Sequence, residues 1–301
     1  MNPQLRSAVS AVHRIVARVP ILAEGYVLLL GRISRCLPSD YFRNGIYNQM
    51  AAIHWPPMDL PAASVEFVPG VTAKMIPHLE EFDFRAQFDR KLGWEEEVLR
   101  WLAGRKYKTI LEIGANVGFY SLFFSRLVQP GGHVFAFEPS QEAFRRLTEN
   151  LRINGVKNVT ALNCAVTAKS GLVQFYEPTG HLTNGSLMRD FAALFSEQIA
   201  TRTSVAIAGG TLEELQLDEP LLLKIDAEGA EETILRSMED LIVRRKPDIV
   251  MEVLPGFEEG LNSLPFLRRC GYHFLNLTDA GPVERPHFVA GSFRDYAVVA
   301  E

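Results

Sequence analysis

The chain has 301 residues, 47% hydrophobic and 22% charged, which is enough for one large α/β domain with an appendage or for two small domains. The net charge of −5 gives no footprint for nucleic acid, so we expect no nucleic-acid partner. Three widely separated cysteines, Cys36, Cys164 and Cys270, have no metal-ligand spacing. They indicate a reducing compartment without a disulfide framework, and we expect a cytoplasmic protein.

Residues 1–60 differ in composition and are predicted to form an N-terminal helical appendage to a main domain of residues 61–301. The first 55 residues contain six arginines, no lysine and two acids, Glu24 and Asp40. Residues 5–18 have the pattern of an amphipathic helix. The apolar run at residues 21–30 is too short and too interrupted to span a bilayer, and it lacks the order of a secretory signal.

Two interpretations of this appendage remain open. A helical pair could pack on the main domain or on a partner, which we favour from sequence alone. Alternatively, residues 1–55 make peripheral contact with an anionic membrane surface. The paired prolines Pro56 and Pro57 then end the helical region.

The next segment predicts a hairpin followed by a helix. Residues 64–68 and 71–76 alternate around Pro69-Gly70, as hairpin strands do. Residues 93–102 read as a helix that begins with three acids, Glu95 to Glu97, which favour the helix dipole. We interpret these acids as a solvated helix start.

The centre of the chain is a strand, a glycine turn and a helix at residues 108–128. A β-branched run leads to Gly114 and Gly118, where missing side chains let a ligand approach the backbone. Asn116 could cap the helix that follows. Glu112 precedes the first glycine, and the dinucleotide pattern G-x-G-x-x-G is absent. An acid here suits the cationic S-adenosylmethionine better than a pyrophosphate; the alternative is a βα turn without a ligand.

Two further strands lead to polar residues at their ends. Residues 133–137 form a strand that ends at Glu138, an acid placed to bind ribose hydroxyls. Ser140 is a fit N-cap for a helix that runs to about residue 154. Residues 158–166 predict a third strand with a polar break at Asn163, whose amide could hydrogen-bond an adenine edge.

Carboxylates also follow the later strands. Residues 221–225 form a strand that precedes Asp226 and Glu228, and the strand at residues 248–254 brings Glu252 to the same edge. Buried carboxylates need hydrogen bonds, cations or protons, which a cationic cofactor and a polar substrate would offer. We expect Glu231 and Glu232 to be solvated. A polar loop at residues 180–187 carries His181. Residues 271–277 and 296–300 predict closing strands, with loop at residues 278–294.

Together these motifs resemble the FkbM-type S-adenosylmethionine-dependent methyltransferases. The resemblance rests on residues 111–121, on Ala136-Phe137-Glu138-Pro139 and on residues 224–231, in this order, and it covers roughly residues 90–300. The Lys-Ile-Asp-x-Glu-Gly stretch with Phe-Glu-Pro is its specific part. Glu112 and Ala227 stand where the family commonly has Asp and Val.

The resemblance implies a seven-stranded Rossmann-like class I methyltransferase sheet with helices on both faces. It also implies S-adenosyl-L-methionine as cofactor and O-methylation of a sugar, glycan or natural-product hydroxyl. The expected cofactor residues are Glu112, Gly114, Asn116, Gly118, Glu138, Asn163, Ala165 and Asp226.

For catalysis we expect Asp226 as the base that takes the hydroxyl proton, because methyl transfer to an alcohol releases one. Glu228 and Glu252 would orient it or replace it, and His181 is a weaker alternative. We expect no metal, although the three acids could instead hold a divalent ion. An NAD-dependent oxidoreductase and a non-catalytic binding protein remain the competing functions.

Overall fold

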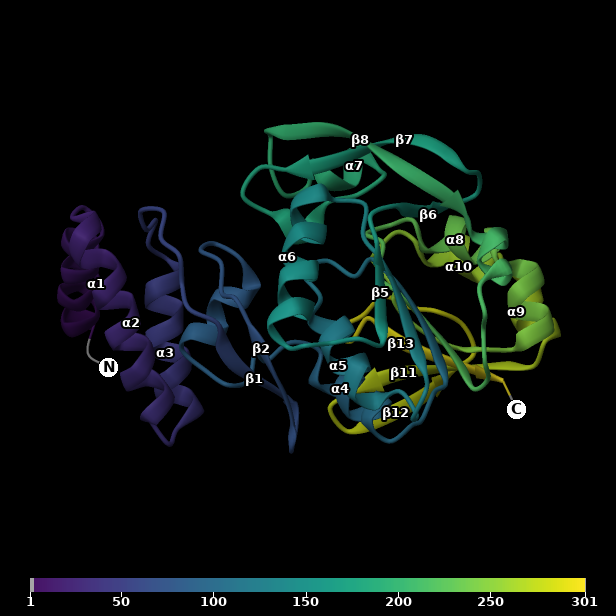
Figure 1. Ribbon diagram of the computed structural model, residues 1–301, viewed down its shortest axis with the longest axis horizontal. Coiled ribbons are helices and arrows are strands. Elements are labelled where there is room, and N and C mark those ends of the chain that lie inside the picture. The colour runs from purple at the N-terminus through teal and green to yellow at the C-terminus, as the bar shows by residue number, and fades with distance from the viewer. Residues whose placement is uncertain (1–2, 301) are drawn as a thin grey trace. The chain divides into compact units, whose positions relative to one another are not determined.

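The computed structural model describes the backbone of residues 3–300 and the side chains of residues 10–300. The chain divides into two compact units, Met1–Trp94 and Glu95–Glu301. Figure 1 shows their elements by label and colour. The boundary expected near residue 60 falls inside the first unit, between its helices and its hairpin.

The first unit contains three helices, a hairpin and a 3-10 helix. Its elements are α1 (Pro3–Ala17), α2 (Pro20–Cys36), α3 (Asp40–Ala51), β1 (Ala63–Val68), β2 (Val71–Met75) and η1 (Phe82–Gln87). The first helix and the hairpin were predicted. Helix α3 was not, because it buries only Met50 and contains Asn44 and Gly45, which are poor helix formers. Val27 of α2, Met50, Trp55 and Phe88 lie in one apolar cluster that holds the unit together.

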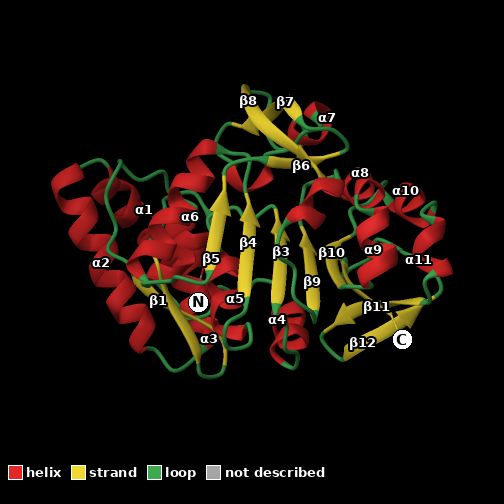
Figure 2. Ribbon diagram, turned by 45° about the vertical axis from the view of Figure 1, so that its right-hand side comes forward, coloured by secondary structure: helices red, strands yellow, loops and turns green. Residues whose placement is uncertain are grey.

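The second unit is built on one mixed sheet in the order β12-β11-β13-β10-β9-β3-β4-β5. Its strands are β3 (Thr109–Ile113), β4 (His133–Phe137), β5 (Val159–Leu162), β9 (Leu221–Ile225), β10 (Asp248–Glu252), β11 (Tyr272–Thr278), β12 (Gly281–Arg285) and β13 (Asp295–Ala300). Strands β5, β4, β3, β9 and β10 are parallel, and β13 inserts antiparallel between β10 and β11. In Figure 2 the arrows of β5, β4, β3 and β9 point the same way.

This arrangement confirms the Rossmann-like α/β fold, with one strand more than expected. Strand β12 lies in the segment predicted as loop and pairs with β11 at the sheet edge. Its residues from Pro282 to Arg285 are exposed, so the apolar alternation that would have indicated a strand is absent.

Helices cover both faces of the sheet. Successive residues of β3 point to opposite sides, so that this buried strand packs against helices on each face. Leu111 and Ile113 join the apolar cluster that contains Ile234, Leu241 and Phe266. Glu112, between them, points to the opposite face and contacts Ser121. The helices of this unit are α4 (Glu96–Ala103), α5 (Phe119–Leu127), α6 (Gln141–Ile153), α7 (Arg189–Ala192), α8 (Glu231–Ser237), α9 (Glu239–Arg245), α10 (Glu258–Asn262) and α11 (Pro265–Arg269).

A second, three-stranded sheet lies beyond the carboxyl ends of the parallel strands (Figure 2). It consists of β6 (Ala165–Thr167), β8 (Ile199–Ala208) and β7 (Gly171–Pro178), in that order, with the 3-10 helices η2 (Leu182–Asn184) and η3 (Gly209–Glu214) nearby in the chain. The predicted strand at residues 158–166 divides at Asn163 and Cys164, so that its two halves join different sheets. Strand β8 was not predicted, because exposed polar residues at 201–203 interrupt its apolar pattern.

No helix among residues 3–300 has both the length and the apolar character that crossing a bilayer requires.

Candidate active site

The predicted site residues follow five neighbouring strands at one level of the sheet. Ile113 of β3 is in register with Phe137 of β4 and with Ile225 of β9, and the next residues are Gly114, Glu138 and Asp226. Phe137 is in register with Leu162, which precedes Asn163. Met251 is in register with Ile225, and Glu252 follows it and pairs with Asp295 of β13. The sheet register therefore places these residues in one row at the carboxyl edge, in the order Asn163, Glu138, Gly114, Asp226, Glu252 and Asp295.

Position 114 requires a glycine because the end of β9 lies against it. Its φ is +85°, and a Cβ atom there would lie 1.8 Å from the carbonyl oxygen of Asp226. The N–H of Asp226 donates to the carbonyl of Ile113 at 2.9 Å, which joins the two strand ends. The glycine thus brings the turn against the backbone of Asp226.

The expectation that Asn116 caps the next helix is wrong. The N-cap of α5 is Gly118, with φ +89° and no side-chain cap. A Cβ atom at Gly118 would lie 2.6 Å from Leu147 Cδ1 of α6, so this glycine allows the close approach of two helices. Asn116 itself has φ +49°, a conformation in which its own backbone N–H faces Glu138.

Glu138 connects two loops through both of its oxygens. Oε2 accepts the N–H of Asn116 and Oε1 accepts the N–H of Ser140, each at 2.7 Å. Burial raises the pKa of Glu138 to about 7, against the lowering effect of these two hydrogen bonds. Ser140 caps α6 as predicted, accepting the N–H of Ala143. The Oδ1 atom of Asn116 is buried and has no hydrogen-bond partner in the described part of the chain.

Glu112 lies beneath the turn, in the core. It is 1% exposed, and its Oε2 accepts a hydrogen bond from Ser121 Oγ at 2.6 Å. Burial raises its pKa to about 8, although Ser121 and Lys224 act in the opposite direction. The geometry thus gives Glu112 a position inside the fold, and its contact with a cofactor stays a prediction.

Lys224 was not among the site residues predicted from the sequence. It is 3% exposed on β9, in register with Glu112. Its ammonium lies 2.7 Å from Asp226 Oδ2 and 4.6 Å from the centre of the Tyr120 ring. Burial acts to lower its pKa, but the carboxylates of Asp226, Glu95 and Asp295 raise it overall. A single lysine within an otherwise apolar buried strand was the available signal.

Around this ion pair the acids outnumber the cations. Glu228 has φ +50°, and its pKa rises to about 9 through burial and the neighbouring Asp226, Glu252 and Glu231. Burial and Asp226 raise the pKa of Glu252 to about 7, with Arg294 at 3.6 Å acting to lower it. Burial and Glu95 raise the pKa of Asp295 well above its ordinary value.

Two acids that we expected to be solvated have structural contacts instead. Glu95 accepts a hydrogen bond from the Tyr120 hydroxyl at 2.5 Å and raises the pKa of Asp295. Glu231 is 2% exposed and accepts the N–H groups of Ala227 at 2.9 Å and Gly229 at 3.1 Å. The periodicity that marks them as helix-start acids reveals neither the contact of Glu95 with Tyr120 nor the loop whose N–H groups bind Glu231.

The remaining predicted residues lie at the edges of this cluster. Asn163 is exposed, and its amide donates to the carbonyl of Glu138 at 2.8 Å, while Ala165 is buried at the start of β6. His181 is exposed, with the Phe195 ring as its aromatic neighbour at 6.3 Å. The loop that carries His181 is fixed near the cluster by Ser186 Oγ, which donates to the carbonyl of Glu228 at 2.7 Å.

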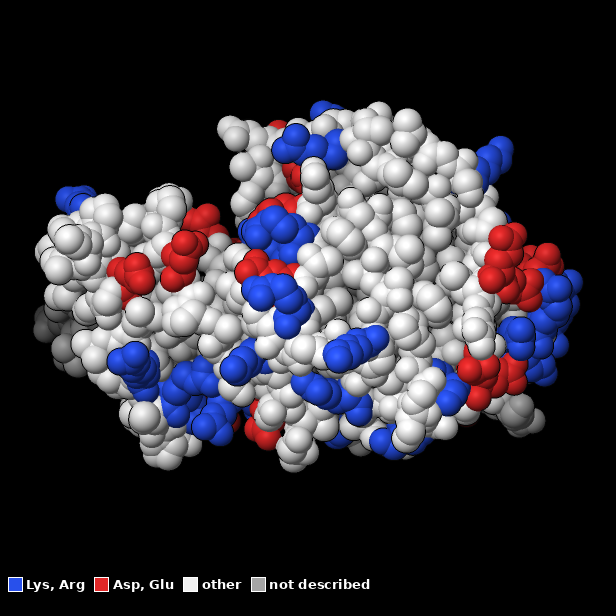
Figure 3. All heavy atoms as spheres, viewed as in Figure 1, with Lys and Arg blue, Asp and Glu red and all other residues white. Residues whose placement is uncertain are grey.

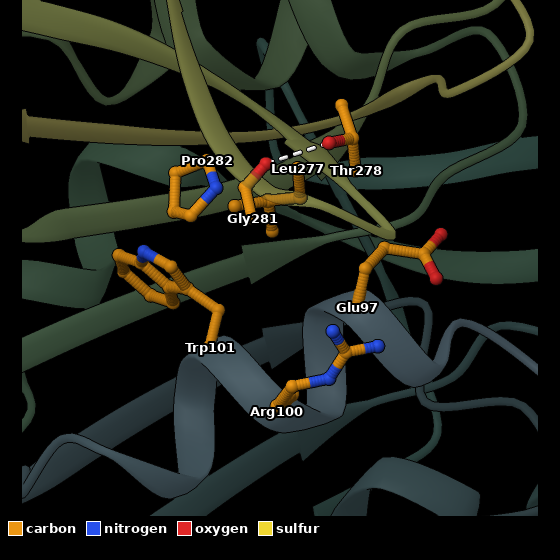
Figure 4. Close-up of a pocket in the computed structure, with 7 residues that line it drawn as sticks. All are labelled: Glu97, Arg100, Trp101, Leu277, Thr278, Gly281 and Pro282. Atoms are coloured by element: carbon orange, nitrogen blue, oxygen red, sulfur yellow. Dashed lines mark hydrogen bonds between the residues drawn. The ribbon is translucent and has the colours of Figure 1, made fainter.

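A shallow cavity of about 160 Å³ lies elsewhere in this unit, between α4 and the turn joining β11 and β12 (Figure 4). Its lining is Glu97, Arg100, Trp101, Leu277, Thr278, Gly281 and Pro282, which includes none of the predicted site residues. Among residues 3–300, no three His, Cys, Asp or Glu side chains are arranged to hold a metal ion.

Residues 112–274 match the "Methyltransferase FkbM domain". The chain belongs to this family. The FkbM match begins at Glu112 and includes Gly114, Glu138, Asp226 and Glu252. Each of these four residues lies at the carboxyl end of a parallel strand, in the row described above.

Among curated relatives, "Methyltransferase 1" of Beauveria bassiana is 24% identical over 207 residues, which cover 64% of this chain and 80% of that protein. "Hexuronic acid methyltransferase AglP" of Haloferax volcanii is 30% identical over 156 residues, or 50% of this chain and 58% of that protein. A solved structure, methyltransferase FkbM from Methylobacillus flagellatus, is 15% identical with a TM-score of 0.41, over 65% of this chain and 44% of that one. The FkbM match lies within the second unit, and the last two alignments cover 58% and 44% of the other protein.

The residues present fit the cofactor of a methyltransferase. S-adenosylmethionine carries a sulfonium and an ammonium group. The row at the carboxyl edge of the sheet contains four acids, Glu138, Asp226, Glu252 and Asp295, which outnumber the neighbouring cations Lys224 and Arg294. Asn116 Oδ1 is a buried acceptor without a partner among the described residues, next to the glycine turn. A buried acceptor of this kind is costly unless a donor reaches it, which a bound ammonium or hydroxyl would do.

Proposed function

We propose that this methyltransferase transfers a methyl group from S-adenosylmethionine to a hydroxyl of a sugar, a glycan or a natural-product small molecule. The observation that carries the proposal is the position of Asp226. Its side chain is partly open to solvent, its backbone contacts the Gly114 turn, and its carboxylate is held by a buried lysine.

For the cofactor, we assign the glycine turn and the neighbouring strand ends. Gly114, Asn116 and Gly118 would border its methionine end, with Glu112 supporting the turn from below. Glu138 would accept hydrogen bonds from the ribose hydroxyls, since each carboxylate oxygen that binds a backbone N–H keeps a second lone pair. Asn163 and Ala165 would border the adenine.

The bound cofactor supplies an electrophilic methyl group with a neutral thioether as leaving group. The chain has to orient the acceptor oxygen and take its proton, which are contributions of position and of general base catalysis. Asp226 is the base we assign. Lys224 positions its carboxylate through the 2.7 Å contact.

Glu228 and Glu252 have a different part in this scheme. Burial raises their pKa values to about 9 and about 7, so that at neutral pH Glu228 holds its proton and Glu252 is poised to exchange one. A protonated Glu228 would donate a hydrogen bond to an acceptor oxygen, and Glu252 would receive the proton from Asp226. His181 remains the alternative base, carried by a loop that Ser186 ties to Glu228.

The acceptor class is supported by one relative, the Haloferax volcanii protein named as a hexuronic acid methyltransferase. A sugar has hydroxyls to methylate and further hydroxyls that polar loops can bind. The test is an assay of S-adenosylhomocysteine release by the full chain, with uronic acids, neutral sugars and their lipid- or peptide-linked forms as acceptors. Product mass and linkage analysis would identify the methylated oxygen. Release that no hydroxyl acceptor stimulates would refute the proposal.

Measurements on the same preparation distinguish the alternative functions. An oxidoreductase would be stabilised against heat by NAD and not by S-adenosylmethionine, and the FkbM match favours the opposite result. A non-catalytic protein would bind S-adenosylhomocysteine without turnover on any acceptor. If the acids hold a divalent ion, EDTA would abolish activity and Mg²⁺ would restore it; we expect activity to be unchanged.

A further inference from the structure

The first unit carries an unusual concentration of exposed apolar side chains on its first helices. Nine large ones lie between residues 12 and 42: Val12, Ile15, Val19, Ile21, Leu22, Leu29, Ile33, Tyr41 and Phe42. Ile21 is 89% exposed and Ile15 is 64% exposed. Isolated exposed apolar residues are ordinary, but a group of nine on adjacent helices indicates an interaction surface.

Helix α2 has apolar residues on two different sides. Ala23, Val27, Gly31 and Ser34 are buried, and a Cβ atom at Gly31 would lie 2.4 Å from the side chain of Gln87, so this side packs within the unit. Leu22, Leu29 and Ile33 fall within about 40° of one another at 100° per residue, and all three are exposed. Packing of the unit therefore uses one side of α2 and leaves a second apolar stripe uncovered.

The charges around this stripe are positive. Arg32 lies about 80° from its centre and Glu24 about 160° from it, on the far side of the helix. Arg18 is exposed in the turn between α1 and α2, beside Val19. Neither Arg18 nor Arg32 has an ion-pair partner within residues 10–300, whereas Asp40 is paired with Arg43. Glu24, the exposed acid of α2, therefore lies away from the apolar stripe.

We propose that the exposed faces of α1 and α2 dock on an anionic lipid surface, with the apolar stripe entering the interface and Arg18 and Arg32 contacting the headgroups. Interfacial helices combine an uncovered apolar face with flanking cations in this way. In Figure 3 the surface over these helices is largely uncharged, with a few separate basic and acidic side chains. From the sequence we favoured packing on protein; in the structure the fully buried residues of α2 lie about 100° or more from the centre of the stripe, which stays exposed. No spanning helix is involved, and the inference is independent of the proposed reaction.

The experiment is sedimentation of the full chain with vesicles of phosphatidylcholine alone and vesicles in which about one third of the lipid is phosphatidylserine. We expect binding to the anionic vesicles only, weakened by salt. Leu22→Ser with Leu29→Ser should lower the partition coefficient about ten-fold, and Arg18→Gln with Arg32→Gln about five-fold per arginine. The matched control is Leu172→Ser with Leu194→Ser, which changes leucines that are 75% and 76% exposed in the second unit and should bind like the wild type.

All variants replace exposed side chains, and their melting temperatures would show that the fold is retained. Equal binding to both vesicle types, absence of binding, or unchanged binding by the Leu22 and Leu29 variant would overturn the proposal. So would a wild-type dimer in solution that this variant converts to a monomer, because the stripe would then be an interface between two copies of the chain.

Discussion

The ammonium of Lys224 lies 2.7 Å from Oδ2 of Asp226, at the point where β9 ends beside the Gly114 turn. The lysine is 3% exposed, whereas 29% of the aspartate side chain is open to solvent. A buried cation thus holds a carboxylate at the surface of the site. This pairing also explains why a lysine is tolerated within the apolar strand, since a buried charge requires a partner of opposite sign.

Asp226→Asn should lower kcat by about 100-fold or more, because the amide cannot take the acceptor proton. It should also lower stability, because the buried ammonium of Lys224 loses its paired carboxylate. Asp190→Asn, at an exposed position of α7, is the matched control and should have wild-type activity. Steady-state kinetics with a hydroxyl acceptor would measure both. An active Asp226→Asn enzyme would transfer the assignment of the base to Glu252 or His181.

Removal of the lysine should show that the pair acts as a unit. Lys224→Met leaves Asp226 facing the other acids without its cation and should cost about 3–5 kcal/mol of unfolding free energy. The double variant with Asp226→Asn should lose less than the sum of the two single variants, while remaining inactive. Urea unfolding of the four proteins gives this coupling. Strict additivity would mean that the contact contributes nothing to stability.

Gly114→Ala should destabilise the second unit by about 3 kcal/mol or more, since its Cβ would collide with the Asp226 carbonyl at 1.8 Å and its φ is +85°. Gly155→Ala is the control for backbone strain alone. Gly155 has φ +61° and open space around the added Cβ, so the cost should be roughly 1–2 kcal/mol. Thermal and urea unfolding would compare the two. Equal losses would show that β3 and β9 can separate to admit the methyl group.

The sequence predicted that the candidate site residues follow neighbouring strand ends, and it failed where long-range contacts decide their environment. Apolar runs located β3, β4, β9 and β10, and the parallel register then aligned Gly114, Glu138 and Asp226. The hydrogen bond of Glu95 with Tyr120 and the burial of Glu231 under the loop before α8 are contacts that no local period encodes. For the same reason, the separation of β6 from β5 was not predicted.

Stability without ligand should decrease as pH rises from about 4.5 towards 9. Burial raises the pKa values of Glu252 to about 7, Glu112 to about 8 and Glu228 to about 9, from an ordinary value of 4.5. The unfolded chain releases these protons at lower pH than the folded chain. The stabilisation is therefore complete below about pH 4.5 and is lost as pH rises through each folded pKa, with at most about 1.4 kcal/mol per pH unit for each group.

Glu228→Gln should reduce this slope between pH 7 and 9, and Glu252→Gln should reduce it mainly below pH 7, because the folded pKa of Glu252 is only about 7. Urea unfolding at intervals of one pH unit would distinguish them. A cationic ligand should oppose the decrease, since it compensates the carboxylates that ionise. Identical slopes for both variants would contradict the assignment of separate titration ranges.

Glu138→Gln should weaken binding of S-adenosylhomocysteine about ten-fold or more. The carboxylate accepts one backbone N–H on each oxygen, and an amide nitrogen cannot accept, so the N–H of Asn116 or of Ser140 loses its partner. The variant also removes one acceptor from the proposed ribose contact. Calorimetry on the folded variant gives the dissociation constant. Glu149→Gln, in an exposed ion pair on α6, is the control and should bind normally. Unchanged affinity in Glu138→Gln would place the ribose away from β4, and a loss of affinity without loss of melting temperature would assign the effect to the ligand contact itself.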